Sequence, residues 1–215
     1  GAANMARNPQ GLVPSVEIDG LTLTQSLAII EYLNDTRGGL LPADAAGRAR
    51  VRALSYAVAM EIHPICNLRV GRYVEAASAG AITMAGWQKK FIAEGLAAVE
   101  GLLSHPATGR FCHGDQITMA DLCLLPQVYN ARRWEVDVTS HVQICRIVAE
   151  LEAIPAIAAA HPRDTEVPVV SNVDAIGHDH GDEWASLLSA QLSSPVRWKQ
   201  CLLTLADLGV TGFAE

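Results

Sequence analysis

The first forty residues change from a two-residue period of apolar positions to a helical period. Residues 16–18 and 21–23 alternate apolar and polar side chains, which predicts two short strands. Asp19-Gly20 between them is a pair typical of a hairpin turn. Apolar residues at helical spacing follow over 27–33, and the glycines and proline of 38–42 end that helix. This segment is predicted to form a β-hairpin followed by one helix.

Helical periodicity dominates the chain from residue 43 to about residue 160. The apolar positions predict a long helix over 43–78 and a second over 82–104. Shorter helices are predicted over 143–152 and 155–160. The residues at core-facing spacing in the two long helices are Val51, Leu54, Ala57, Met60, Ile65 and Leu68, then Phe91, Ile92, Leu96, Val99 and Leu103.

A strong helix-start signal lies at residues 117–122. Thr118 can cap the amide of Asp121, and the Asp121 carboxylate can reach back to the Thr118 amide. Ile117 and Leu122 supply the hydrophobic contact that accompanies such a box. We interpret this signal as structural, and expect a buried helix with its apolar side at Leu122, Leu124, Leu125 and Val128.

Composition narrows the class of protein. The 215 residues carry a net charge of −7, which argues against a nucleic-acid or anionic-membrane partner. No apolar run reaches the roughly 18–20 residues of a membrane span, and no signal peptide is visible. The five cysteines are scattered and odd in number, and no metal site is predicted. We expect a reduced, cytoplasmic, globular protein.

Two candidate binding elements flank the predicted hairpin. Before it, a cis Val13-Pro14 bond would end strand pairing and present the Val13 backbone to an extended peptide. In this setting we favour the cis form, although only about 5–6% of X-Pro bonds are cis and a trans bond is the alternative. After the hairpin, the Ser26 hydroxyl and the first-turn amides can bind an anion beside Gln25. The alternative there is a plain serine cap beside a solvated glutamine.

A third candidate is the segment from His63 to Arg69. His63 and Asn67 are four residues apart, so one face of a helix should carry both. Pro64 is expected to kink that helix. The planar guanidinium of Arg69 suits a substrate carboxylate. A satisfied helix histidine and a surface arginine are an equally open interpretation.

These motifs together resemble the zeta class of glutathione transferases, which includes the maleylacetoacetate and maleylpyruvate isomerases. The resemblance covers about residues 5–162. It implies a mainly α, glutathione-transferase-like fold, with an incomplete thioredoxin-like βα remnant in residues 1–42. An all-helical domain would follow in residues 43–162, with the helix after Thr118 as its buried core helix.

The resemblance also implies ligands for particular residues. It places glutathione against Val13, Pro14, Gln25, Ser26, His63 and Asn67, with the γ-glutamyl carboxylate at Gln25-Ser26. The run 127–134 is similar to a family segment in which an arginine near the Arg133 position contacts the acidic substrate. Arg69 would be the second substrate-binding residue. Interaction of Arg132 and Arg133 with a helix C-terminus is the alternative.

The implied activity is glutathione-dependent cis–trans isomerisation of a small cis-dicarboxylic acid in aromatic amino-acid catabolism, by a homodimer. Family members activate the glutathione thiol with a Ser-Ser-Cys run, and the 215 residues contain no such run. We therefore expect an N-terminally truncated chain with no assignable catalytic residue and impaired turnover. A non-catalytic glutathione-binding scaffold and an inert fusion product are the alternatives.

The composition changes from Arg163 onward. A polar linker leads to a predicted strand within 164–175, and helix, helix and strand patterns follow. About residues 166–215 resemble the C-terminal part of malonyl-CoA:acyl-carrier-protein transacylase. Residues 163–215 are therefore expected to form a small α/β tail, joined to the helical domain near 162–167.

Overall fold

The computed structural model describes residues 8–11, 14–158, 169–170 and 177–178. These residues fall into two compact units, one within Asn4–Ile154 and one from Pro155 onward. In the second unit, helix α8 (Pro155–Ala158) and an antiparallel pair of strands, β3 (Val169–Val170) and β4 (Gly177–His178), are described. The helices and the last strand predicted after residue 178 lie outside the described residues.

The predicted hairpin is confirmed. Strand β1 (Ser15–Ile18) pairs antiparallel with β2 (Leu21–Thr24), with Ser15 opposite Thr24 and Ile18 opposite Leu21. The turn residues Asp19 and Gly20 have φ values of 52° and 78°. Positive φ at both central positions is the mark of a type I′ turn, whose twist matches that of the strands.

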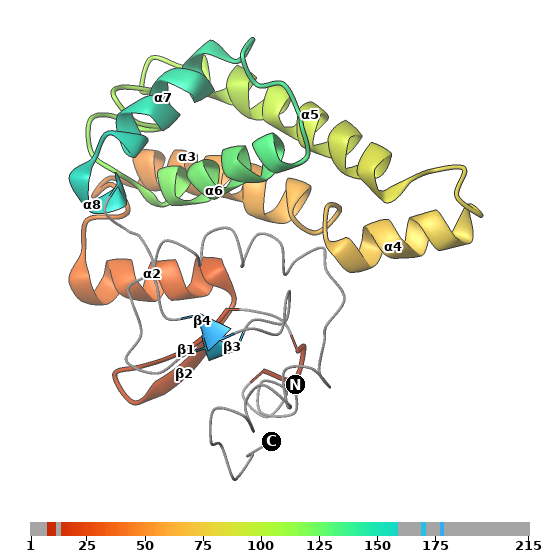
Figure 1. Ribbon diagram of the computed structural model, residues 1–215. Coiled ribbons are helices and arrows are strands. Elements are labelled where there is room, and N and C mark those ends of the chain that lie inside the picture. The colour runs from red at the N-terminus through yellow and green to blue at the C-terminus, as the bar shows by residue number, and fades with distance from the viewer. Residues whose placement is uncertain (1–7, 12–13, 159–168, 171–176, 179–215) are drawn as a thin grey trace. The chain divides into compact units, whose positions relative to one another are not determined.

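Helix α2 (Ser26–Arg37) lies beside the hairpin (Figure 1). Side chains of α2 also bind the hairpin turn. The Asp19 carboxylate accepts hydrogen bonds from the Tyr32 hydroxyl at 2.8 Å and from Arg37 Nη2 at 3.0 and 3.1 Å. These two partners, Tyr32 first, hold the pKa of Asp19 below its ordinary value. The hairpin turn is thereby connected to α2 at Tyr32 and at Arg37, the last residue of the helix.

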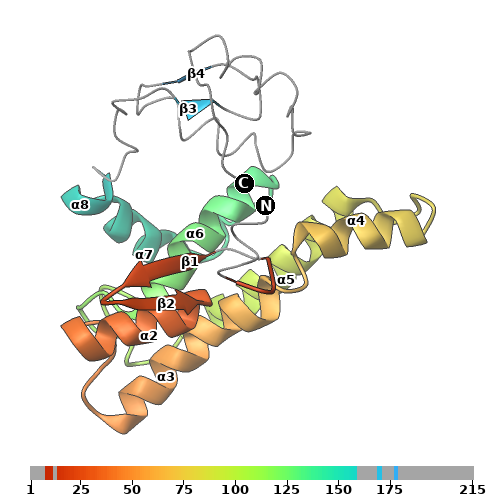
Figure 2. The same cartoon turned by 90° about the horizontal axis from the view of Figure 1, so that it is seen from below.

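The helical body follows α2 in the same unit. Its elements are α3 (Ala45–Tyr56), the π-helix η1 (Ala57–Ile62), α4 (Leu68–Ala77), α5 (Met84–Leu103), α6 (Met119–Arg133) and α7 (Val142–Glu152). Helix α6 packs against α3 on one side and α7 on another, and α5 packs against η1, α4 and α7 (Figure 1). Figure 2 shows the change of direction between α3 and α4 from a second side.

The prediction of one long helix over 43–78 is wrong, because the structure has α3, η1 and α4 in this segment. After Tyr56 the backbone changes to a π-helix, in which the His63 amide donates to the Val58 carbonyl at 3.1 Å. The wider turn moves the apolar stripe out of phase, so Val58 and Ile62 are 1% exposed whereas Met60 is 57% exposed. The prediction places Met60 in the core because it assumes the α-helical period. Each hydrogen bond of a π-helix spans one residue more, which that period does not include.

Helix α6 starts at the predicted box. The Asp121 carboxylate is 1% exposed and accepts hydrogen bonds from the Thr118 amide and hydroxyl, each at 2.8 Å. Its other oxygen accepts from the Cys112 amide at 2.9 Å, which fastens the preceding loop to the helix start. Leu124 and Val128 are buried as predicted, but Leu122 is 38% exposed because it lies on the solvent side of α6.

No helix in the described part of the chain combines the length and apolarity that a bilayer crossing requires. The four described cysteines, Cys66, Cys112, Cys123 and Cys145, are free thiols. Burial raises the pKa of Cys66 and of Cys123 to about 11. Burial, together with the nearby Asp121 carboxylate, also raises the pKa of Cys112.

The raised thiol pKa of Cys123 predicts a loss of stability in alkali. An unfolded thiol ionises near pH 8.5, so its contribution is complete below that pH and is lost as pH rises toward the folded value of about 11. The unfolding free energy of Cys123→Ala should therefore fall less steeply than that of the parent, by up to about 1.4 kcal/mol per pH unit. Urea denaturation at pH 8, 9 and 10 measures the difference, and parallel curves for the two proteins would contradict this expectation.

Candidate functional site

The hairpin register brings two of the predicted binding elements to one end of the sheet. Pro14 directly precedes β1, Gln25 directly follows β2, and the strand residues next to them, Ser15 and Thr24, are opposite each other. Pro14, Gln25 and Ser26 are all exposed. Val13 and its bond to Pro14 lie outside the described residues, so its predicted role stays a prediction.

Gln25 has an unusual backbone conformation at the start of α2. Its φ of 71° and ψ of 116° are costly for a residue with a Cβ, and such strain concentrates at functional sites. Its side chain makes no cap to the helix and instead donates to Gln10 Oε1 at 2.6 Å. Gln25 therefore takes the cap position, and Ser26 is the first helical residue instead of the cap.

The first turn of α2 is suited to an anion. Its first helical hydrogen bond runs from the Ile29 amide to the Gln25 carbonyl at 3.0 Å. The three amides before Ile29 thus have no partner within the helix, and they point from its positive end. Together with the exposed Ser26 hydroxyl, these amides could bind an anion, and the predicted anion site at Gln25-Ser26 stays a prediction.

His63 and Asn67 do not share a helix face. Residues 63–66 form a turn after η1, and Asn67 is the N-cap of α4, where its Oδ1 accepts from the Arg69 amide at 3.0 Å. The expected kink is a complete break because Pro64 cannot donate to the helix ladder and Asn67 starts a new helix. The two side chains come instead from one turn, which we call the 63–67 turn.

The 63–67 turn is held from α5. Trp87 Nε1 donates to the Ile65 carbonyl and Gln88 Nε2 donates to the Cys66 carbonyl, each at 2.9 Å. His63 at the start of the turn is exposed, yet partial burial of its ring lowers the pKa of His63. Its neighbour Gln127 of α6 opposes that shift by interacting with the ring.

The predicted substrate arginines lack acidic partners within the described residues. Arg69 is exposed, and its guanidinium makes no ion pair or side-chain hydrogen bond there. Arg133 is half-buried and lies 5.8 Å from the centre of the Trp134 ring. Arg132, by contrast, is engaged by Glu152 at 2.6 Å. Of the adjacent pair, Arg133 is the one with a guanidinium left for a carboxylate.

The site residues form two groups. Pro14, Gln25 and Ser26 share the hairpin end, and His63 and Asn67 share the 63–67 turn. Within the described part of the chain, no hydrogen bond or ion pair joins one group to the other. Sequence reasoning missed Gln88, which contacts the 63–67 turn from α5, and assigned no role to Gln127, which is fully buried in α6. A polar residue at a core position of an apolar helix is the signal that could have found Gln127.

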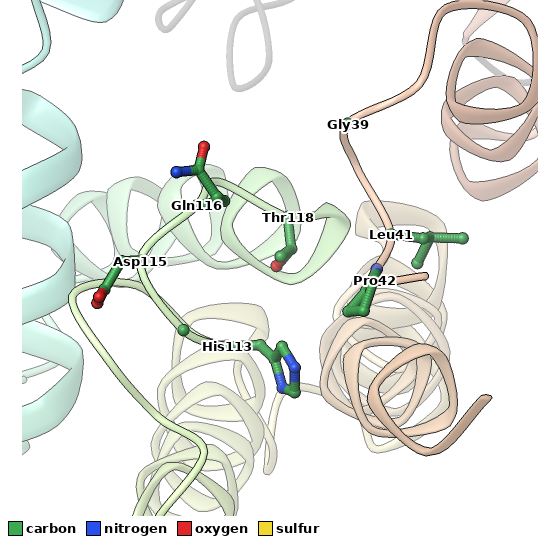
Figure 3. Close-up of a pocket in the computed structure, with 8 residues that line it drawn as sticks. Gly39, Leu41, Pro42, His113, Asp115, Gln116 and Thr118 are labelled. Atoms are coloured by element: carbon green, nitrogen blue, oxygen red, sulfur yellow. The ribbon is translucent and has the colours of Figure 1, made fainter. Parts of the chain in front are cut away.

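A cavity of about 390 Å³ lies elsewhere, between the loop after α2 and the loop before α6. Figure 3 shows His113, Asp115 and Gln116 around it with their side chains pointing in different directions. None of the predicted site residues lines this cavity. The described residues also contain no group of three or more metal-ligating side chains. The polar side chains around this cavity do not point toward a common centre, so the cavity is not a candidate functional site.

Comparison with known proteins finds similar sequences and similar solved structures. The family described as "Glutathione S-transferase, N-terminal domain" matches residues 5–35. Maleylacetoacetate isomerase of Rhizobium meliloti (strain 1021) is 60% identical over 162 residues, which cover 74% of this chain and 76% of that protein. The holo structure of a maleylpyruvate isomerase, a bacterial zeta-class glutathione transferase, matches with a TM-score of 0.69 and 40% identity over 74% of this chain and 76% of that one. The chain belongs to the maleylacetoacetate isomerase family of zeta-class glutathione transferases.

The family membership explains the architecture. A maleylacetoacetate isomerase from Methylobacterium extorquens AM1, solved with bound malonate and glutathione, has a TM-score of 0.69 at 36% identity, over 74% of this chain and 76% of that one. The predicted glutathione-transferase fold, with a small N-terminal sheet and a mainly helical body, is thereby confirmed. Neither the truncation nor the transacylase resemblance of residues 166–215 is tested by these relatives, and both stay predictions.

Proposed function

We propose that this zeta-class chain acts in the glutathione-dependent cis–trans isomerisation of a maleyl-type dicarboxylic acid, maleylacetoacetate or maleylpyruvate. The observation that carries the proposal is the hairpin register. It sets Pro14 and the strained Gln25-Ser26 start of α2 at one exposed end of the sheet. Relatives of both substrate specificities match the chain, so the two substrates are proposed together.

The residues present fit glutathione. The first-turn amides of α2 and the Ser26 hydroxyl suit its γ-glutamyl carboxylate, and the Val13 backbone is proposed to pair with its peptide. Asn67 uses Oδ1 for its own helix, which leaves the Nδ2 group to donate to a ligand carbonyl. His63 would face the same ligand from the start of that turn.

Arg69 and Arg133 are proposed to bind the carboxylates of the substrate. Both guanidinium groups lack acidic partners within the described ranges, and the related structure from Methylobacterium extorquens holds the dicarboxylate malonate. A bidentate arginine–carboxylate pair would fix the orientation of the diacid. When bound, glutathione supplies the thiol that adds to the cis double bond, permits rotation and is then eliminated.

The 215-residue chain by itself is proposed to bind glutathione but to turn over slowly. It contains no Ser-Ser-Cys run to stabilise the thiolate of a bound thiol, whose pKa is otherwise near 8.5. The described thiols do not replace that run, since burial raises the pKa of Cys66 and Cys123 to about 11. A non-catalytic glutathione-binding protein is the second candidate for this reason.

Calorimetry with S-methylglutathione, paired with a maleylacetoacetate turnover assay, tests the proposal. We expect binding that Ser26→Ala weakens about tenfold, because one hydrogen bond to a charged group is worth about 1.4 kcal/mol or more. Ser104→Ala, at an exposed position after α5, is the matched control and should leave the affinity unchanged. Binding with turnover typical of an isomerase would disprove the impairment, binding without turnover favours the second candidate, and absence of binding would refute both.

We also propose a cytoplasmic homodimer. Free thiols at all four described cysteines fit a reducing compartment. Leu122 and Tyr129 lie seven residues apart on the solvent side of α6 and are 38% and 54% exposed, which suits an interface. Sedimentation equilibrium gives the mass directly, and a monomer at all concentrations would disprove the dimer.

A further inference from the structure

Trp87 and Gln88, neighbours on α5, bind two successive carbonyls of the 63–67 turn. Trp87 Nε1 donates to the Ile65 carbonyl and Gln88 Nε2 donates to the Cys66 carbonyl, each at 2.9 Å. Because the helix is broken at this turn, no main-chain amide of the described residues donates to either carbonyl. The side chains of α5 therefore replace the helical hydrogen bonds that the turn lacks.

The hydrogen bond from Gln88 fixes the peptide group directly before Asn67. The Cys66 carbonyl and the Asn67 amide share one planar peptide unit, so a donor that orients the carbonyl also orients the backbone nitrogen of Asn67. Asn67 itself has the extended backbone of an N-cap, and its Oδ1 accepts from the Arg69 amide at 3.0 Å. With its backbone oriented by Gln88 and its Oδ1 held by α4, Asn67 has its Nδ2 group set in one direction.

Gln88 is itself confined by the close approach of α4 to α5. It is 0% exposed, and a Cβ at Gly71 of α4 would lie 2.7 Å from Met84 Cγ and 3.4 Å from Gln88 Nε2. The Oε1 atom of Gln88 is buried without a hydrogen-bond partner among the described residues. An unpaired buried oxygen is costly, so a glutamine here stabilises the fold little beyond an apolar side chain of the same size.

We propose that Gln88 is a positioning residue for Asn67, with Trp87 in a supporting role. Gln88 orients the Cys66–Asn67 peptide, and Asn67 presents its Nδ2 donor to a carbonyl of bound glutathione, a contact that rests on the proposed function. Trp87 acts one peptide further from Asn67, through the Ile65 carbonyl. A glutamine with a structural role alone would change stability, whereas a positioning residue changes the affinity for the ligand.

Calorimetry with S-methylglutathione tests the proposal through a double-mutant cycle. Gln88→Met keeps the side-chain volume and removes the donor, so binding should weaken about fivefold while the urea midpoint stays close to that of the parent. Trp87→Phe removes Nε1, keeps an aromatic ring against Phe91 and should weaken binding about twofold. Asn67→Ser keeps an N-cap oxygen on a shorter side chain and should weaken binding about fivefold. Added to Gln88→Met, it should cause no further loss.

Ser26→Ala is the control within this cycle. Ser26 belongs to the hairpin end and has no hydrogen bond to the 63–67 turn among the described residues, so its effect should multiply with that of Gln88→Met. Unchanged affinity of Gln88→Met, whatever its urea midpoint, would overturn the proposal. Independent losses for Gln88→Met and Asn67→Ser would overturn it as well.

Amide hydrogen exchange gives a second readout, without any ligand. The Arg69 amide, which donates to Asn67 Oδ1, should exchange faster in Gln88→Met than in the parent, and at the parent rate in Ser26→Ala. A parent protein that binds no S-methylglutathione would refute the proposed function alone. An unchanged exchange rate of the Arg69 amide in Gln88→Met would refute the positioning role of Gln88.

Discussion

Replacing Asp121 by alanine should lower the free energy of unfolding by about 3 kcal/mol. The carboxylate is 1% exposed and accepts three hydrogen bonds from Thr118 and Cys112. Its removal leaves the Thr118 and Cys112 amides buried without a partner. Urea denaturation followed by circular dichroism at 222 nm measures the loss.

Asp115→Ala is the matched control for this prediction. Asp115 lies in the loop that precedes α6 and accepts one hydrogen bond, from the Arg110 amide at 2.8 Å, but it is exposed. Its replacement should cost no more than about 1 kcal/mol, because water can satisfy the freed amide. If Asp121→Ala and Asp115→Ala lower the unfolding free energy equally, burial of the Asp121 carboxylate does not determine its contribution to stability.

Replacing Gly95 by alanine should also destabilise the fold, by about 2 kcal/mol, although alanine favours helices. A Cβ at Gly95 would lie 2.4 Å from Ile62 Cγ1 and 2.6 Å from Ile62 Cδ1, which is shorter than any tolerated contact. Ile62 is 1% exposed and ends the π-helix before His63. The variant should therefore also reduce the affinity for S-methylglutathione, measured by calorimetry beside the unfolding free energy.

Gly101→Ala separates packing from helix propensity. A Cβ at Gly101 of the same helix meets no atom within 4 Å, so this change should stabilise the protein by up to about 1 kcal/mol. The double variant Gly95→Ala, Ile62→Ala should lose less stability than the sum of the two single losses, because Ile62→Ala removes the atoms that the new Cβ meets. If Gly95→Ala changes the unfolding free energy by the same amount as Gly101→Ala, the close approach of α5 to η1 does not contribute to stability.

Local signals made most of the fold predictable. The hairpin follows from two alternating segments around Asp19-Gly20, and α6 follows from the Thr118 box, because each signal acts within a few residues. The π-helix at 57–62 was not predictable in this way. It packs against α5, where Ile62 lies at Gly95, and no single-sequence period contains that information.

The site was predictable only where a motif carries its own geometry. Gln25-Ser26 is fixed by the strand that precedes it, so its placement beside Pro14 followed from the hairpin. Gln127 is a fully buried polar residue of α6, and its surroundings arise only when α6 packs against α3, η1 and α7. Long-range contacts of this kind leave no periodic trace in the chain.

The N-terminal segment is fastened to the helical body at two points. Arg52 of α3 makes a two-point ion pair with Glu31 of α2, at 2.7 and 3.3 Å, and the Met119 amide of α6 donates to the Leu40 carbonyl at 2.9 Å. Any recombinant exchange of residues 8–41 between relatives should therefore retain an acid at position 31 and the backbone course at position 40. A donor segment that lacks either anchor would carry its own ligand contacts but present them at the wrong angle to the recipient's arginines.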